Sequence, residues 1–220
     1  MRDDFQERLD ELSTTLVTMC DIADGAIVAA SSALNESNLA AAEQAVDRSA
    51  QLTAMEEPAQ SQAMLLLALQ APVGRDLRQI VASVHLIGDL VRMGQLAEHV
   101  AKVVRRNHPV DTGGAARPIL IQMGEVAHEL ISAAKHVLAD PDPSHAASID
   151  ARDDVMDRLA DELSDVVLSD ESISVPEAID AVLLCRFFER FGDHAVSVGR
   201  RIVYLATGTF PEPASSEQRD

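Results

Sequence analysis

The sequence predicts an all-α fold, organised as two tandem three-helix bundles related by internal duplication. Aromatic residues make up only 3% of the chain and tryptophan is absent, whereas strands favour aromatic and β-branched residues. Apolar residues recur every three or four positions over long stretches, which is the period of an α-helix. In addition, the last helical stretch has a copy 98 residues earlier in the chain.

The clearest predicted helix covers residues 183–205 and has an apolar seam whose steps alternate between four and three residues. Its seam consists of Leu184, Phe188, Phe191, Ala195, Val198, Ile202 and Leu205. A shift of 98 residues places the first six on Leu86, Leu90, Met93, Ala97, Val100 and Val104, all of them apolar. The copies differ at two acidic positions, because Glu189 becomes Val91 and Asp193 becomes Gln95.

The first repeat is predicted to span residues 1–107, with helices at 4–34, 39–69 and 75–107. Asn38 can cap the second helix, since its side chain accepts hydrogen bonds from free backbone N–H groups. Pro58 predicts either a kink in that helix or a break into two pieces. Residues 71–74 interrupt the helical pattern before the third helix.

A linker over residues 108–118, rich in proline and glycine, separates this repeat from a second one over 119–208. The second repeat is predicted to have helices at 119–138 and 145–169, and a last helix that starts after a capping box between Ser174 and Glu177. Gly208 supplies the residue that ends it. The polar tail, 209–220, is expected to be disordered.

Two acidic pairs in the second repeat are the candidate site. Glu189 and Asp193 lie four residues apart on the last helix, and Asp153 and Asp157 have the same spacing on the preceding one. Clustered carboxylates favour hard or borderline cations, which take oxygen ligands. The alternative is a solvated acidic helix face, held by pairs such as Arg186 with Glu189.

The segment ERFGDHA, which starts at Glu189, resembles the ERIGDxA signature of the PhoU family, regulators associated with phosphate transport. The stretch of 30 residues that starts at Leu65 resembles the other signature of that family, and the weakened acidic motif of the first repeat is similar to that of actinobacterial members. The resemblance implies divalent or ferric metal ions at Asp153, Asp157, Glu189 and Asp193. In the first repeat, Val91 and Gln95 argue against an equivalent site.

The resemblance also implies a function, namely a non-enzymatic cytoplasmic regulator that couples the phosphate ABC transporter, through its ATP-binding subunit, to a sensor histidine kinase. Such a protein would repress the phosphate-starvation response when phosphate is plentiful, would associate peripherally with membrane complexes and would form a homodimer. Two alternatives stay open: a metal-binding bundle whose acidic cluster is itself the function, and a purely structural helical scaffold.

Charge and composition narrow these possibilities further. A net charge of −18 argues against nucleic-acid binding, which depends on neutralising phosphates. We find no targeting segment, and no apolar run approaches the roughly 18 residues of a membrane span. Cys20 and Cys185 form no CxxC pair and are expected to be free thiols in a cytoplasmic protein. No catalytic motif is recognisable, which favours an adaptor over an enzyme.

Overall fold

A computed structural model describes residues 2–139 and 143–209. Within these ranges the chain has six α-helices, one short 3-10 helix and no strand, which confirms the all-α prediction. The elements are α1 (Arg2–Glu36), α2 (Leu39–Gln70), α3 (Gly74–Asn107), η1 (Gly114–Ala116), α4 (Arg117–Ala139), α5 (Pro143–Ser169) and α6 (Val175–Thr207). Apart from Thr209, the tail predicted to be disordered lies outside the described residues.

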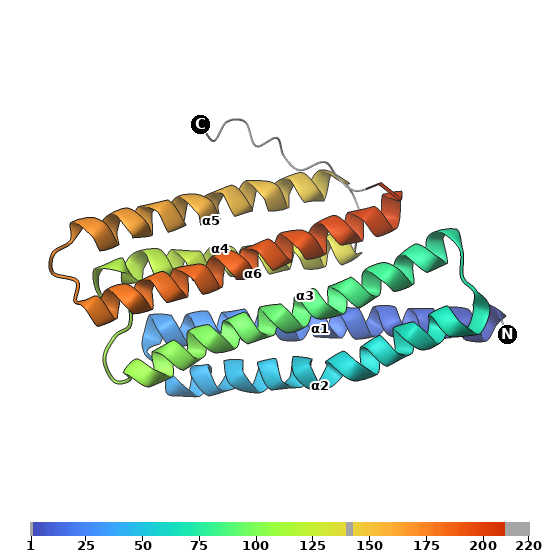
Figure 1. The fold of residues 1–220 in the computed structure, drawn as a ribbon, viewed down its shortest axis with the longest axis horizontal. Helices are drawn as coiled ribbons and strands as arrows, with labels where there is room; N and C mark the ends of the chain where they lie inside the picture. The colour runs from blue at the N-terminus through green and yellow to red at the C-terminus, as the bar shows by residue number, and fades with distance from the viewer. Residues whose placement is uncertain (1, 140–142, 210–220) are drawn as a thin grey trace.

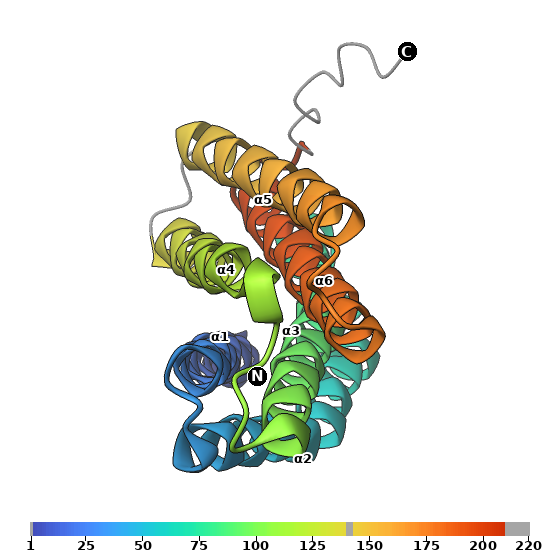
Figure 2. The ribbon, with the colours of Figure 1, turned by 90° about the vertical axis from the view of Figure 1, so that its left-hand side faces the viewer.

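The first three helices form one antiparallel bundle and the last three form another, and the two bundles lie side by side (Figure 1). The bundles meet where α3 packs against α6 and α1 against α4, while α2 and α5 lie on opposite outer sides (Figure 2). Lys135 on α4 reinforces this contact, because its Nζ atom lies 2.8 Å from carboxylates of both Asp21 and Asp24 on α1. The two repeats therefore share one continuous core.

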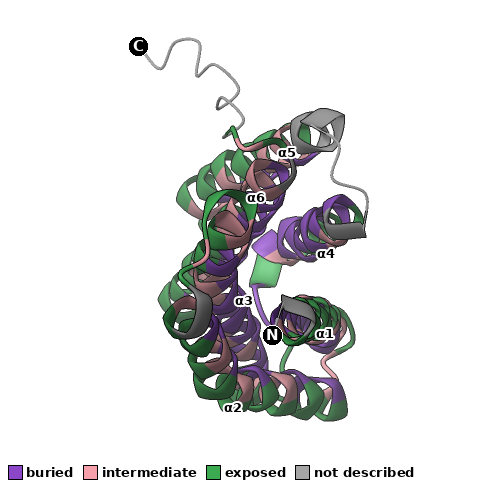
Figure 3. Cartoon of the chain, turned by 90° about the vertical axis from the view of Figure 1, so that its right-hand side faces the viewer, coloured by how far each residue is buried: buried purple, intermediate pink, exposed green. Residues whose placement is uncertain are grey.

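Both copies of the duplicated seam face this core. The first six seam residues of α6 and their six counterparts on α3 are each at most 2% exposed. Phe188 and Phe191 are the largest of the fully buried side chains. Buried residues line the inner sides of the helices, whereas exposed residues cover the outside (Figure 3). Burial of apolar surface on this scale is the main term that stabilises the fold.

The helix ends follow the predicted capping chemistry. The Asn38 carbonyl oxygen of the side chain accepts hydrogen bonds from the backbone of Ala40 at 3.0 Å and Ala41 at 3.2 Å. Ser174 and Glu177 form the predicted capping box, and Gly208 ends α6 with a φ of 79°. The α2 helix continues through Pro58, so of the two predicted alternatives, a kink or a break, the break does not occur. Packing of α2 against α1 and α3 holds the helix together, and its course bends part-way along (Figure 1).

The connector between the repeats is more ordered than its composition suggests. It contains η1, and Pro118 stands in the first turn of α4, where a missing N–H costs nothing. Arg117 donates to the carbonyl oxygen of Asn35 at 2.9 Å and to Asp111 at 2.8 Å. Before the connector, Asn107 donates to the buried Asp180 on α6 at 2.6 Å. These bonds fix the connector to both bundles.

Two helices, Asp4–Glu36 within α1 and Gly74–Asn107, are long and apolar enough to span a membrane by length and composition. The expectation that no segment reaches this threshold is therefore wrong. The reason is core packing, since 50% and 61% of the most apolar windows of these helices are buried inside the bundles. A core helix that is buried along its length passes the same test, so the finding is weak evidence for a membrane span.

Candidate functional site

The acidic cluster lies between α5 and α6 of the second repeat. Asp153 projects from α5 towards the backbone of α6, where Gly192 stands in the ERFGDHA segment. A methyl group on Gly192 would lie 3.5 Å from Oδ1 of Asp153 and 3.2 Å from Cδ1 of Leu130. This glycine therefore allows a carboxylate and a core leucine to approach the helix together.

Asp153 is the carboxyl group of this cluster whose pKa is raised. Its pKa is raised from the ordinary value of 3.8 to about 6, chiefly by burial and then by the negative charges of Asp157, Asp193 and Asp150. Arg200 opposes this effect, but it is engaged with Asp150, whose Oδ1 lies 2.8 Å from its Nη2. The neighbouring carboxylates are therefore close enough to Asp153 to disfavour its charged form.

A cavity of about 390 Å³ opens beside these carboxylates. It is lined by Asp153, Asp193, Val196, Ser197, Arg200 and Arg201. The lining combines two acidic with two basic side chains, so its charges are largely balanced. Such a lining can orient a polar partner or ion.

Glu189, the fourth predicted ligand, has different partners. The Cys185 thiol donates to Oε2 of Glu189 at 3.8 Å, and Arg186 lies 3.7 Å from the same oxygen. Burial, followed by the charge of Glu189, raises the pKa of Cys185 to about 12, so this thiol stays protonated. The ion pair with Arg186 that the sequence suggested as an alternative is present.

The side-chain arrangement does not assemble a complete metal-ligand set. Among the described residues, no group of three or more His, Cys, Asp or Glu side chains has a geometry that could hold a metal ion. The charges of Asp157 and Asp193 raise the pKa of Asp153, whereas Glu189 accepts a hydrogen bond from the Cys185 thiol. The metal assignment to these four residues therefore stays a prediction.

The first repeat has a different network at the equivalent place. Val91 is buried, and Gln95 accepts a hydrogen bond from Arg92 at 2.9 Å. Nearby, Glu98 accepts from Ser49 at 2.6 Å and pairs with Lys102 at 2.5 Å. Burial alone would raise the pKa of Glu98, but these two partners lower it overall. In place of the acidic pair, the first repeat therefore has a buried valine and a glutamine, with a polar network nearby that links α2 to α3.

Asp89 on α3 is a central residue that the sequence analysis missed. Its carboxylate lies 3.0 Å from Nδ1 of His194 and 3.1 Å from the hydroxyl of Ser197, both on α6. Arg201 completes the group, with its Nε 3.3 Å away. Burial would raise the pKa of Asp89, yet the hydrogen bonds and positive charges of these partners lower it. The three partners follow a spacing of three and four residues, a polar row that could have signalled the contact.

This contact has a counterpart at the other end of the seam between α3 and α6. A shift of 98 residues relates Asp89 to Phe187 and His99 to Ser197. Phe187 and His99 are in contact as well, with ring centroids 5.1 Å apart. The duplicated positions therefore meet twice across the seam, once as a polar pair and once as an aromatic pair.

Comparison with known proteins decides the family. The sequence profile of the PhoU domain matches residues 16–104 and 120–202, one match in each bundle. The chain belongs to the PhoU family. Phosphate-specific transport system accessory protein PhoU homolog 2 of Mycobacterium tuberculosis is 43% identical over 96% of this chain and 100% of its own length. PhoU homolog 1 of Mycobacterium leprae is 42% identical over 96% of both chains.

Solved PhoU structures share the fold. The crystal structure of PhoU from Pseudomonas aeruginosa superposes with a TM-score of 0.88, at 22% identity, over 93% of this chain and 100% of that one. PhoU from Streptococcus pneumoniae gives 0.83 at 24% identity, over 94% of this chain and 99% of that one. The prediction of a PhoU-type arrangement of tandem three-helix bundles is thereby confirmed, and mycobacterial relatives agree with the actinobacterial type.

Proposed function

We propose that this chain is a non-enzymatic accessory protein that regulates phosphate transport at the cytoplasmic face of the membrane. The observation that supports this most is the match to mycobacterial relatives named as phosphate-specific transport accessory proteins, which spans both repeats. An accessory role also agrees with the architecture, because two rigid bundles on a shared core offer long outer helix faces to partners.

In the finer proposal, the chain binds the ATP-binding subunit of the phosphate ABC transporter and signals the state of the transporter to a sensor histidine kinase. The mechanism is a population shift, in which the chain binds one conformation of the kinase better than the other. Preference for the phosphatase-competent conformation would keep phosphate-starvation genes silent when phosphate is plentiful.

Deletion of the gene tests this proposal. A reporter for the phosphate-starvation response should become active in high phosphate, and a plasmid copy of the gene should silence it again. Crosslinking from membranes, with and without phosphate, should capture both the kinase and the ATP-binding subunit. A reporter that stays silent in the deletion strain would refute the regulatory role.

The second candidate is a metal-binding bundle, and the crowding of carboxylates around Asp153 supports it. A cation there would relieve the repulsion that raises the pKa of this residue. Protein purified without chelator should then retain a stoichiometric metal in elemental analysis. A variant with Asp153→Asn and Asp193→Asn should lose the metal, whereas Asp154→Asn, on the exposed side of α5, should keep it. A metal-free wild-type protein would count against this candidate.

A further inference from the structure

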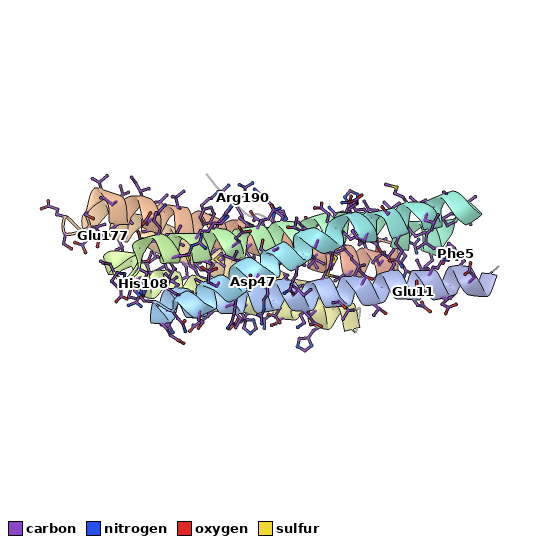
Figure 4. All side chains as sticks on the ribbon, turned by 90° about the horizontal axis from the view of Figure 1, so that it is seen from below. Phe5, Glu11, Asp47, His108, Glu177 and Arg190 are labelled. Carbon is purple, nitrogen blue, oxygen red and sulfur yellow. The ribbon has the colours of Figure 1, made fainter. Side chains whose placement is uncertain are left out.

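A cleft of about 360 Å³ opens between the two bundles, where α4 ends. Lys135 on α4 pairs with Asp21 on α1, and α4 ends at Ala139, one turn further on. The α1 helix continues past this end, through Glu11 towards Phe5 (Figure 1, Figure 4). The walls of the cleft therefore belong to α1 and α3 of the first bundle and to α6 of the second.

One end of the cleft is polar. Gln79 on α3 donates from Nε2 to the hydroxyl oxygen of Ser13 on α1 at 3.0 Å, so these two residues lie level with each other. Thr14 lies beside Ser13, and Arg75 precedes Gln79 by one turn at the exposed start of α3. The two helices run in the same direction, so the residues that follow this polar group lead towards the middle of the molecule (Figure 1).

The other end of the cleft is aliphatic. Leu16 and Val17 lie one turn after the polar residues of α1, and Leu86 lies two turns after those of α3. Ile202 and Leu205, on the last turns of α6, complete this part of the lining. Leu16, Leu86 and Ile202 are each at most 4% exposed, so they form a buried floor. The cleft thus suits a ligand with a polar head and an aliphatic body.

Arg75 supplies the only charge among the described residues that line the cleft. Within the described part of the chain, its guanidinium group takes part in no ion pair. The hydroxyl protons nearby are already used, since Ser13 donates to the carbonyl oxygen of Leu9 at 3.0 Å and Ser83 to that of Gln79 at 2.7 Å. The donor left for a ligand is therefore the guanidinium group, which binds carboxylates through two parallel hydrogen bonds.

We propose that this cleft binds a free fatty acid of medium chain length, with its carboxylate on Arg75 and its alkyl chain directed towards Leu86 and Ile202. Arg75 and Leu86 are eleven residues apart on α3, so the cleft extends over about 16 Å. An extended dodecanoate chain matches this length, and the volume of the cleft lies in the range of small-molecule sites. Burial of the alkyl chain supplies most of the free energy of binding.

Other occupants fit the cleft less well. Inorganic phosphate would leave the aliphatic walls in contact with water, and a net charge of −18 repels small anions in general. A membrane with anionic lipids would meet Asp10 and Glu11, which are exposed on α1 directly before the polar end of the cleft. A single fatty acid satisfies the one cation and fills the aliphatic end without approaching these carboxylates.

Isothermal titration calorimetry of the full chain with sodium dodecanoate, below its micelle concentration, tests the polar end. The wild-type chain should bind one molecule, and Arg75→Glu should weaken binding at least about tenfold, because the carboxylate then meets a like charge. Arg158→Glu is the matched control, since it makes the same change at an exposed residue of α5, outside the cleft. A wild-type chain that does not bind dodecanoate, or an Arg75→Glu variant that binds as tightly as Arg158→Glu, overturns the proposal.

A pair of tryptophan substitutions tests the aliphatic end. Val17→Trp should abolish binding, because Val17 is 45% exposed and a larger side chain there fills the cleft without entering the core. Val28→Trp is the control, since Val28 is 43% exposed on the same helix but does not line the cleft. Circular dichroism checks that both variants are folded. Equal binding of dodecanoate by the two variants overturns the proposed position of the alkyl chain.

Two further probes distinguish the other occupants. Inorganic phosphate should displace dodecanoate no better than chloride of the same ionic strength. Vesicles of phosphatidylcholine and phosphatidylglycerol should not sediment the chain. Specific displacement by phosphate, or sedimentation with vesicles that Val17→Trp abolishes, overturns the assignment to a fatty acid. These outcomes do not depend on the proposed role in phosphate regulation.

Discussion

Replacement of Asp153 by asparagine should stabilise the protein at neutral pH. The pKa of Asp153 rises from 3.8 to about 6 on folding, chiefly through burial and then through neighbouring carboxylates. A change of this size corresponds to about 3 kcal/mol as an upper bound. Because the side chain is only half-buried and water screens its charge, we expect about 1–2 kcal/mol for Asp153→Asn at pH 7.5.

The raised pKa of Asp153 also determines how the stability difference between Asp153→Asn and the wild type changes with pH. A carboxyl group whose pKa is higher in the folded than in the unfolded state costs stability as the pH rises from 3.8 to about 6, and the cost is complete above that value. The advantage of Asp153→Asn should therefore fall to roughly half at pH 5. Asparagine has nearly the same volume, so packing against Gly192 changes little.

Urea unfolding at pH 5 and pH 7.5, in buffer with a chelator, measures both values. Asp154→Asn is the control, because this neighbouring residue on α5 is exposed and should give a difference near zero. An Asp153→Asn variant that is no more stable than the wild type at pH 7.5 would refute the account of Asp153. A gain that is equal at both pH values would do so as well, since it could not arise from titration.

Three further outcomes test other parts of the structure. Asp89→Ala should lower the free energy of unfolding by about 2–4 kcal/mol in urea unfolding, because it leaves three donors on α6 unpaired. The stability that the Asp89 carboxylate contributes to the wild type should be lost as the pH falls below 3.8 and passes its lowered pKa. Phe188→Ala should cost about 3–5 kcal/mol, since this side chain is 0% exposed, and a loss below 1 kcal/mol would contradict its central place in the core. Ala71→Gly should raise the free energy of unfolding by about 1 kcal/mol, because Ala71 has a φ of 45°, whereas Ala40→Gly within α2 should lower it by a similar amount.

Local patterns were enough to predict the helices and their caps. Asn38, Ser174 and Gly208 act through neighbours a few residues away, so sequence spacing identifies their roles. The bond between Asp89 and His194 joins residues 105 positions apart, and the sequence alone does not state which helices meet. For the same reason, periodicity predicted an apolar face on α3 and on α6 but not that the two helices pack against each other.

The candidate site was predicted in part. Spacing placed Asp153, Asp157 and Asp193 close together, since residues four apart on a helix share a side and two helices of a bundle are neighbours. Glu189 differs because the adjacent thiol of Cys185, one turn earlier, provides a bonding partner. Which partner a carboxylate takes depends on distances of a few tenths of an ångström, which periodicity does not specify.

The two ends of the contact between α3 and α6 should respond differently to salt, because one contains the polar pair Asp89 and Ser197 and the other the aromatic pair His99 and Phe187. Salt weakens a contact between charged groups, whereas it leaves a contact between rings almost unchanged. Because Asp89 also meets His194 and Arg201, the polar end of the contact between α3 and α6 should be the more sensitive of the two to ionic strength.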